Sequence, residues 1–418
     1  MVEHCDVLIV GTGHGGAQAA ISLRQRKFTG SITLVGEEPE LPYDRPPLSK
    51  EYLSGERGFE RLLVRPPAFW SQRQISILTG RAAVSVNPHE HTVELSNADV
   101  LHYGGLIWAA GGRARRLTCT GHDLRGVHTL RNKSDVDRVT RELPSTRQVA
   151  VIGGGYIGLE AAAVLCKRGV QVTVLEALDR VLARVAGEPL SRFYESEHRA
   201  HGVDIRLDTI VECIEENEGW AAGVRLAAGR SIAADMVIVG IGILPNVEPL
   251  LAAGAVGDNG VAVDAYCRTS LPDIWAIGDC ALHPNSSAGG RRLRLESVQN
   301  ASDMALTVAK ALTGAPEPYT AVPWFWSNQY DLRLQTVGLS LGHDQALIRG
   351  DIKSRSFSVI YRKAGRVIAL DCVNAPKDYA QGRALVINAV ATESSALTDT
   401  NVALKALCWD AGVESTSS

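Results

Sequence analysis

The sequence predicts an α/β protein with two similar parallel-sheet domains and a C-terminal α+β domain. An apolar strand, a glycine turn, a small-residue helix and a second strand follow one another in residues 6–37. The same order returns in residues 149–176. Residues 334–373 contain several β-like segments after a proline-containing linker, which is typical of an antiparallel sheet. At 418 residues the chain is also too long for one hydrophobic core.

The composition is that of an ordinary globular α/β protein. Hydrophobic residues make up 45%, aromatic residues 6%, and the net charge is −3, so we expect neither a nucleic-acid partner nor a membrane. The first apolar strand follows Met1 almost at once, which leaves no room for a signal peptide, and no apolar run approaches the roughly 20 residues of a spanning helix. We therefore expect a cytoplasmic protein.

The first glycine turn follows the apolar run 7–10. Gly11 permits the tight turn, Gly13 lets the backbone approach a pyrophosphate, and Gly16 lets helix and strand pack closely. The helix N-terminus offers unpaired N–H groups to phosphates, and Glu37 ends the second strand, where a carboxylate accepts hydrogen bonds from a ribose. This pattern predicts a Rossmann-like dinucleotide site.

A proline-rich loop, residues 39–50, comes next. Its adjacent prolines should exclude a helix until Ser49, which could cap a short one through Leu53. The stiff backbone fits a role in holding Arg45 and Lys50 toward an anionic ligand, and it fits ordinary exposed cations equally well.

The second glycine turn, Gly153 to Gly158, separates the strand 149–152 from a helix through Arg168, and the next strand ends at Glu176. Each turn alone is weak evidence, but two in register strongly favour two dinucleotide sites. A carboxylate at the position of Glu176 pairs with a free 2′-hydroxyl and repels a 2′-phosphate, which predicts NADH rather than NADPH.

Later segments add a candidate cofactor acid and no candidate metal site. Asp279 ends a short strand from Ile274, where it is suited to a ribityl hydroxyl, and a helix is predicted over 298–312. The eight cysteines are scattered without a CxxC pair, which argues against disulfides and zinc, so no metal site is predicted.

Together these features resemble the two-dinucleotide-binding flavoproteins with the glutathione-reductase-like fold. More narrowly, the chain resembles the NADH-dependent ferredoxin reductases of the putidaredoxin reductase type. The most specific segments are 43–50, 153–160, 240–246, 276–280, 295–300 and 323–330. The resemblance implies an FAD domain at 1–111 and 242–322, an NAD domain at 112–241 inserted in it, a C-terminal α+β domain at 323–410, and a flexible tail at 411–418.

The resemblance also assigns residues. Lys50 would lie near the flavin N5 edge as a catalytic residue, and Glu160 would lie at the nicotinamide side, paired with Lys50. The residues implied for FAD are Gly11, Gly13, Gly15, Gly16, Glu37, Arg45, Lys50, Ala83, Arg131, Asp279, Val298 and Trp326. Those implied for NAD are Gly153, Gly155, Tyr156, Ile157, Gly158, Glu176 and Gly242. Trp324 and Trp326 would shield the flavin edge or form a domain-interface cluster.

The activity implied is electron transfer from NADH through FAD to a [2Fe–2S] ferredoxin, which serves a cytochrome P450 or a ring-hydroxylating oxygenase. An NADH oxidase or a monodehydroascorbate-type reductase shares this fold, and a redox-sensing flavoprotein like apoptosis-inducing factor is a further alternative. Residues 41–58 hold no cysteine, which disfavours thiol chemistry. For the ferredoxin, the basic cluster Arg291, Arg292 and Arg294, or Arg65, is either a docking rim or an ordinary solvated loop.

Overall fold

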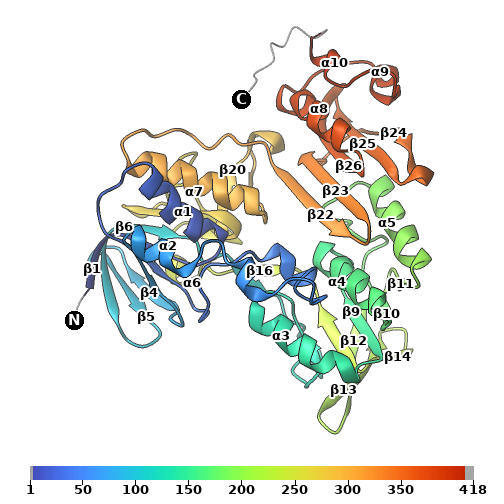
Figure 1. Cartoon of the computed structure of the whole chain (residues 1–418), viewed down its shortest axis with the longest axis horizontal. Coiled ribbons are helices and arrows are strands. Elements are labelled where there is room, and N and C mark those ends of the chain that lie inside the picture. The colour runs from blue at the N-terminus through green and yellow to red at the C-terminus, as the bar shows by residue number, and fades with distance from the viewer. Residues whose placement is uncertain (1–2, 410–418) are drawn as a thin grey trace. The chain divides into compact units, whose positions relative to one another are not determined.

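The computed structural model describes residues 3–409, which divide into two compact units (Figure 1). Unit 1 holds the chain up to Arg45, Phe59–Arg113 and Ile243–Pro323, and unit 2 holds Pro46–Gly58, Ala114–Gly242 and the chain from Trp324 on. Compared with the expected domain bounds, the loop Pro46–Gly58 and the C-terminal region both group with unit 2. The predicted tail, residues 411–418, lies outside the described residues.

The main sheet of unit 1 is built around two neighbouring parallel strands, β1 (Glu3–Val10) and β6 (Val100–Trp108). Five more strands complete it: β2 (Ile32–Val35), β3 (Ile75–Leu78), β4 (Ala83–Asn87), β5 (Thr92–Leu95) and β19 (Ile274–Ala276). Because β6 is nine residues long, its start pairs antiparallel with β5 and its end pairs parallel with β19. The carboxyl ends of β1, β2, β6 and β19 therefore meet at one edge, where parallel sheets bind ligands.

Two helices of unit 1, α1 (His14–Gln25) and α7 (Val298–Leu312), pack against each other (Figure 1). The buried face of α1 contains Ala17, Ala19 and Ala20, whose small side chains permit this close approach. The shorter elements are α2 (Pro67–Gln72), α6 (Glu248–Ala252), β7 (Gly112–Ala114), β16 (Ile243–Pro245), β17 (Gly257–Asp258), β18 (Gly260–Ala262), β20 (Ala281–Pro284) and β21 (Arg292–Leu293).

Unit 2 contains the second parallel sheet. Its strand order is β11 (Asp204–Arg206), β10 (Gln171–Leu175), β9 (Gln148–Ile152), β15 (Met236–Val239) and β8 (Val127–His128). The helices are α3 (Lys133–Glu142), α4 (Tyr156–Lys167) and α5 (Glu188–Ala200). An antiparallel ribbon of β12 (Val211–Asn217), β13 (Trp220–Leu226) and β14 (Ser231–Ala233) was not predicted from the sequence.

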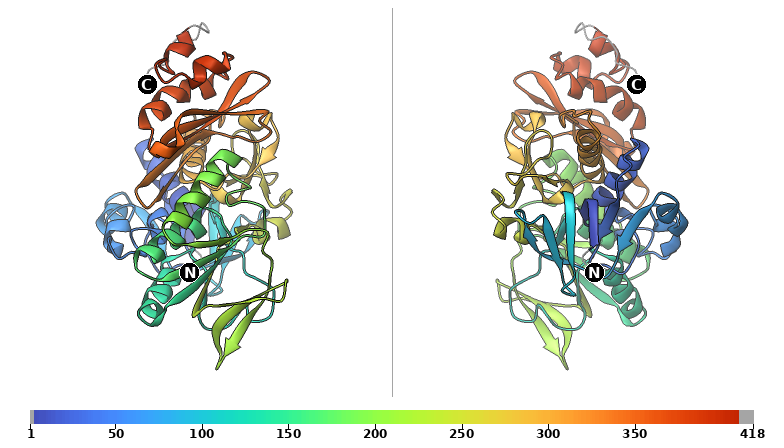
Figure 2. Two further views of the ribbon diagram at one scale, coloured as in Figure 1. Left: turned by 90° about the vertical axis from the view of Figure 1, so that its right-hand side faces the viewer. Right: turned by 90° about the vertical axis from the view of Figure 1, so that its left-hand side faces the viewer.

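The predicted antiparallel sheet near the C-terminus is present in unit 2. Its order is β22 (Trp324–Gln329), β23 (Leu332–Gly338), β26 (Arg366–Val373), β25 (Ser356–Lys363) and β24 (Gln345–Asp351). Helix α8 (Pro376–Ile387) packs on β23 and β26, and α9 (Ser394–Thr398) and α10 (Ala406–Trp409) follow it. Both views of Figure 2 show these red helices next to the orange strands. The aromatic segment is thus an edge strand, β22.

The proline loop differs from the prediction. A 3₁₀ helix, η1 (Pro46–Ser49), begins at the first of the two prolines, so the expectation that no helix precedes Ser49 was wrong. Proline is tolerated in a first helical turn because the N–H it lacks would have no intrahelical partner there. The other 3₁₀ helices are η2 (Phe59–Leu62), η3 (Leu143–Ser145), η4 (Gly278–Cys280), η5 (Ser286–Ala288) and η6 (Ile352–Ser354). Within residues 3–409, no helix is long and apolar enough to cross a bilayer.

Candidate functional site

The first glycine turn leaves no room for side chains at two of its glycines. Gly11 has φ +113°, and a Cβ there would lie 2.2 Å from the Ala109 carbonyl oxygen. A Cβ at Gly16 would lie 1.8 Å from the carbonyl oxygen of Gly11. At Gly15 it would meet Ile277 at an ordinary 3.5 Å. Gly11 and Gly16 are therefore required by the chain's own backbone.

Gly13 is different, because it faces open space. It is the N-cap residue of α1, no side chain caps the helix, and its nearest neighbour to a built Cβ is Arg45 Nε at 3.9 Å. By contrast, Asn132 caps α3 and Ser297 caps α7 through side-chain oxygens. An uncapped N-terminus beside a guanidinium, with no acid in the first turn, fits a pyrophosphate.

Arg45 is held in place by the loop that precedes η1. Its guanidinium forms an ion pair with Glu38, and its Nη1 donates to the Tyr43 hydroxyl at 3.2 Å. Burial lowers the pKa of Arg45, but the neighbouring Tyr43, Glu38 and Asp279 raise it more, so the net pKa lies above the ordinary value. Arg45 is therefore a fixed cation within unit 1, near both the α1 N-terminus and Asp279.

The sequence predicted that Asp279 ends the strand from Ile274, but β19 ends at Ala276 and Asp279 lies three residues later, in η4. Gly278 adopts φ +72°, and a Cβ there would lie 3.2 Å from Ala301 of α7. The turn therefore packs against the start of α7, of which Val298 is the first residue. Asp279 and Val298, both implied FAD residues, thus come from adjoining elements.

Arg294 does not fit its assignment to the partner surface. Its side chain is only 9% exposed, its Nη1 donates to the Asp279 carbonyl oxygen at 2.6 Å, and its Nη2 lies 3.0 Å from Glu296. The residue supports the Asp279 turn and offers almost no surface to a partner. Arg291, Arg292 and Arg65 are exposed, as the prediction requires.

Two other implied FAD residues lie at the edges of unit 1 elements. Glu37 follows β2 by two residues and is exposed, and within residues 3–409 no hydrogen bond or ion pair to its side chain is found. Ala83 begins β4 and is half-buried. Lys50, Arg131 and Trp326 lie in unit 2, so the residues implied for FAD come from both units.

The second glycine turn repeats the steric logic of the first. Gly153 has φ +105°, and a Cβ would lie 2.4 Å from the Gly240 carbonyl oxygen. A Cβ at Gly158 would lie 2.2 Å from the Gly153 oxygen. Gly155 is the N-cap of α4, again without a capping side chain, and its nearest neighbour is 4.0 Å away. This helix terminus also fits a pyrophosphate.

Glu176 is already hydrogen-bonded by the backbone around this turn. The N–H of Gly154 donates to Oε2 at 2.7 Å and the N–H of Leu178 donates to Oε1 at 2.9 Å, while the side chain is buried. Each carboxylate oxygen can accept a further bond, so the group is oriented to receive the hydroxyls of a ribose.

The remaining implied NAD residues lie in the first turn of α4 and in the loop after β15. Tyr156 begins α4 and its ring lies 4.6 Å from that of Phe325 in β22, while Ile157 is 42% exposed. Gly242 has φ +100° and open space where a Cβ would be. An exposed apolar side chain and an open glycine are compatible with a ligand surface.

Lys50 and Glu160 form a buried ion pair within unit 2. Lys50 Nζ lies 2.7 Å from Glu160 Oε2, with side-chain exposures of 12% and 4%. Two hydroxyls that were not predicted as site residues complete the site: Ser49 Oγ donates to Oε2 and Ser327 Oγ donates to Oε1, both at 2.6 Å. Because the ion pair is buried and both carboxylate oxygens accept hydrogen bonds, its geometry is fixed. Loss of either charge would leave the other charge buried and uncompensated.

Arg131 and Trp326 lie elsewhere in unit 2. The backbone N–H of Arg131 donates to Asp135 at 3.0 Å, just before the capped start of α3. Trp326 is half-buried on β22, with its ring 5.6 Å from that of Trp324. The two tryptophans form an aromatic face on this edge strand.

Burial disfavours the reactive thiolate form of two of the cysteines. All eight cysteines are free, and burial raises the pKa of Cys280 and of Cys372 to about 12. Among residues 3–409, no group of three or more His, Cys, Asp or Glu side chains could hold a metal ion.

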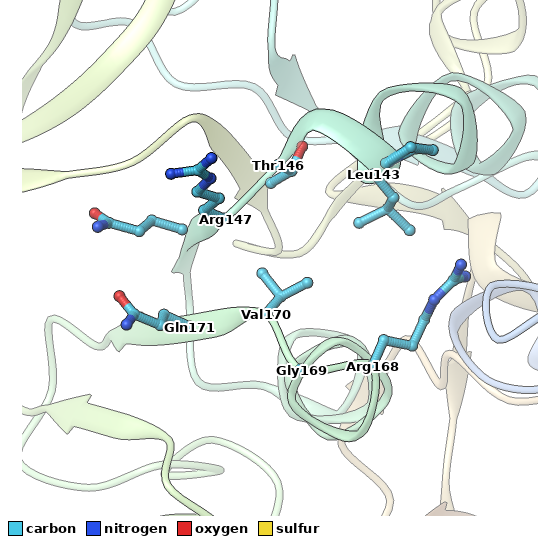
Figure 3. A pocket seen from close by; sticks show the side chains of 9 residues that line it. Leu143, Thr146, Arg147, Arg168, Gly169, Val170 and Gln171 are labelled. Atoms are coloured by element: carbon cyan, nitrogen blue, oxygen red, sulfur yellow. The ribbon is translucent and has the colours of Figure 1, made fainter.

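Unit 2 also contains a pocket of about 640 Å³, and Figure 3 shows the residues that line it. Its lining includes Arg147 and Gln148 at the start of β9 and Gln171 at the start of β10. Gly153 and Glu176 follow the opposite ends of the same strands, where open parallel sheets bind nucleotides. The pocket is large enough for a ligand but is not the predicted nucleotide site.

Comparisons with known proteins cover nearly the whole chain. The family model described as pyridine nucleotide-disulphide oxidoreductase matches residues 5–305, and the reductase C-terminal model matches residues 324–408. A 5,5′-dehydrodivanillate O-demethylase ferredoxin reductase subunit of Sphingobium sp. is 58% identical, over 97% of this chain and 99% of the relative. A ferredoxin–NAD(P)+ reductase of Sphingomonas sp. is 57% identical, over 96% and 97%. The solved putidaredoxin reductase–putidaredoxin complex superimposes with a TM-score of 0.94 at 38% identity, over 98% of this chain and 99% of that one.

Proposed function

The chain belongs to the pyridine nucleotide-disulphide oxidoreductases and to their ferredoxin reductase branch, and we propose the following electron path for it. Electrons pass from NADH through FAD to a [2Fe–2S] ferredoxin, which serves a cytochrome P450 or a ring-hydroxylating oxygenase. The observation that carries the proposal is the pair of glycine turns, each with an uncapped helix N-terminus that fits a pyrophosphate.

The chain's own residues bind and orient in this scheme. FAD, when bound, supplies the exchange between a two-electron hydride and single electrons. Gly13 and Arg45 would hold its pyrophosphate, and Asp279 a ribityl hydroxyl. Lys50 would supply a positive charge toward the flavin, kept in place by the carboxylate of Glu160 at 2.7 Å. Catalysis then depends on position and electrostatics rather than on a nucleophile.

The preference for NADH over NADPH is assigned to Glu176. Its carboxylate is buried and held by two backbone N–H groups, so it cannot turn away from the ribose of a bound nicotinamide dinucleotide. A free 2′-hydroxyl would donate to it, whereas a 2′-phosphate would meet like charge in a desolvated place.

The ferredoxin is proposed to dock on Arg291 and Arg292, with Arg65 as a second candidate, because ferredoxins are acidic. Arg291→Glu or Arg292→Glu, made singly, should raise the KM for ferredoxin at low ionic strength, while NADH-to-ferricyanide turnover stays the same. The matched control is Arg230→Glu, an equally exposed charge reversal in unit 2. Equal losses in both assays would remove these residues from the docking surface.

We propose the cytoplasm as the compartment. The eight free cysteines support this assignment, because thiols stay reduced there, and the cytoplasm also supplies NADH.

The central test is an anaerobic titration of the purified flavoprotein with NADH and with NADPH, followed by cytochrome c reduction with and without an added [2Fe–2S] ferredoxin. We expect stoichiometric bleaching by NADH and cytochrome reduction that requires the ferredoxin. Cytochrome reduction indifferent to ferredoxin, or rapid oxygen consumption by the reductase alone, would favour the oxidase alternative.

A further inference from the structure

A continuous row of buried hydrogen bonds leads away from the Lys50–Glu160 pair. Ser327 Oγ donates to Glu160 Oε1 at 2.6 Å, and Gln329 Nε2 donates to Ser327 Oγ at 3.2 Å. His198 Nε2 lies 2.8 Å from Gln329 Oε1, and the Tyr330 hydroxyl lies 3.0 Å from His198 Nδ1. All of these residues belong to unit 2, and the proposed electron path uses none beyond Glu160.

The row exists because β22 alternates its side chains between two faces. Phe325, Ser327 and Gln329 point to the face that contacts α4 and α5, whereas Trp324 and Trp326 share the other. Ser327 and His198 are fully buried and Gln329 is 2% exposed. Tyr330 is half-buried, and the exposed His201 stacks on its ring at 3.7 Å. The row therefore runs from the ion pair to the surface of the unit.

The charge of Glu160 determines the direction of every bond in the row. A carboxylate only accepts, so the Ser327 hydroxyl must donate to it and its oxygen must accept from the amide nitrogen of Gln329. The Gln329 carbonyl oxygen then faces His198, which must carry its proton on Nε2. The lone pair on Nδ1 is left to accept from Tyr330. Each donor thus points toward Glu160, and bonds aligned in this way strengthen one another.

We propose that Ser327, Gln329, His198 and Tyr330 form a positioning relay that fixes the Glu160 carboxylate, and through it the Lys50 ammonium, for flavin reduction by NADH. The inference rests on the proposed function, which gives the ion pair its place in electron transfer. Ser327 and Ser49 hold one carboxylate oxygen each, so the plane of the group cannot rotate without breaking a buried bond.

The relay transmits orientation rather than protons. The Gln329 amide lies in the middle of the relay. It does not take up a proton on its oxygen and release one from its nitrogen, so no proton passes through it. His198 also stays neutral, because burial lowers the pKa of its imidazole to about 4. The relay is therefore intact and uncharged over the whole range in which the enzyme would work.

The kinetic test is the limiting rate of flavin reduction by NADH in the holoprotein, measured by stopped flow. Ser327→Ala removes a bond to a charged group and should slow reduction by about 10- to 100-fold. Gln329→Met should slow it by about 3- to 10-fold, and Tyr330→Phe by less than about threefold, because each acts through more intervening bonds. The dissociation constant for NADH should stay close to that of the wild type in all three variants.

Ser358→Ala is the matched control. Ser358 is also fully buried in the C-terminal sheet, and its hydroxyl also donates to a carboxylate, that of Asp378, at 3.0 Å. It should lower the melting temperature as much as Ser327→Ala does and leave the reduction rate unchanged. Equal rate losses in both serine variants, or a wild-type rate in Ser327→Ala, would overturn the relay.

A second measurement does not depend on activity. The imidazole ¹⁵N signals of the oxidised holoprotein, with His198→Gln to identify the residue, should show His198 as the neutral Nε2–H tautomer at pH 7. An Nδ1–H tautomer or an imidazolium would overturn the proposal. Failure of the proposed function would look different, because NADH would then not reduce the wild-type flavin, while the tautomer would still decide the direction of the hydrogen bonds.

Discussion

The two glycine turns share a sequence pattern but hold their acids differently. The N–H of Gly11 donates to the Val35 carbonyl oxygen at 2.7 Å, and the N–H of Gly153 donates to that of Leu175 at 2.8 Å. By this register, Gly36 occupies the place of Glu176, and Glu37 comes one residue later. The first acid is exposed, whereas the second is buried and held by two backbone N–H groups.

The cause is the residue after the first glycine of each turn. In the first turn it is Thr12, whose Oγ1 would lie 2.2 Å from a Cβ at position 36, so its side chain takes the space and only glycine fits opposite. In the second turn it is Gly154, and the Glu176 carboxylate fills the equivalent space. A rigid acid suits a cofactor that must be recognised at every turnover. An exposed acid suits a cofactor that stays bound through many other contacts.

The largest expected effects come from the tight glycines. In Gly16→Ala the new Cβ meets the Gly11 oxygen, which should abolish FAD retention. In Gly158→Ala it meets the Gly153 oxygen, which should leave a yellow protein whose reduction by NADH is slowed more than about 100-fold, a loss near 3 kcal/mol. Flavin content after gel filtration and stopped-flow reduction measure the two outcomes.

Each glycine variant is the control for the other. If Gly158→Ala lost its flavin, or if Gly16→Ala kept flavin and failed only toward NADH, the assignment of the two turns to FAD and NAD would be reversed or wrong.

The two acids should differ in importance. Glu176→Ala should raise the KM for NADH about 10- to 100-fold and reduce the preference over NADPH, because a buried, charged acceptor is lost. Glu37→Ala should raise the dissociation constant of FAD only a few-fold, as an exposed hydrogen bond contributes about 1 kcal/mol or less. The measurements are steady-state kinetics with both nucleotides and fluorescence titration of the apoprotein with FAD.

Glu176→Gln sharpens the test. An amide can accept from only one of the two N–H groups of Gly154 and Leu178, so its NH₂ would face a donor. It should behave more like Ala than like Glu. An unchanged NADH to NADPH ratio in both variants would show that another residue makes the discrimination.

The sequence predicted the features that depend on local backbone sterics. Helix α7 has the predicted bounds, and the Gly11 and Gly153 turns follow their strands as expected, because strand, turn and helix signals lie within a few residues. Ser327 could not be predicted, since it meets Glu160 across 167 residues of chain. Arg294 looked like part of a basic surface run, because composition does not reveal which side chain turns inward to a carbonyl oxygen.

A moderate effect is expected from exchanging the space-filling residues. Gly36→Ala should destabilise the holoprotein by about 1–3 kcal/mol, because its Cβ overlaps Thr12. Thr12→Gly in the same chain should restore much of this loss, giving a coupling in a double-mutant cycle measured by urea unfolding. Additive losses would mean that Thr12 is not what excludes a side chain at position 36.

The residues that begin the two helices are anchored differently as well. His14 Nε2 lies 3.0 Å from Asp44 Oδ1, an acid whose side chain is 47% exposed. Tyr156 instead packs on Phe325, and burial first and the charge of Asp371 second raise the pKa of its phenol. Asp371 is buried in β26, where the Tyr361 hydroxyl donates to its Oδ2 at 2.7 Å. The second helix is therefore anchored on the C-terminal sheet, beside a buried acid.

The buried Asp371 should also make the stability of the protein depend on pH. Burial raises the pKa of Asp371 to about 7, against an unfolded value of about 3.9. Between these values the folded state keeps its proton while the unfolded state loses it. The stabilisation present below pH 4 is therefore lost as pH rises to 7. Asp371→Asn should be less pH-dependent in this window and more stable than the wild type at pH 8, by roughly 2–4 kcal/mol.

Asp331→Asn, which removes a carboxylate whose pKa is lowered by a hydrogen bond from Arg355, should show the opposite sign. It should lose stability at pH 7, and this loss should vanish in acid. Urea unfolding from pH 4 to 8 measures both, and an Asp371→Asn curve parallel to the wild type would mean that this carboxyl titrates normally.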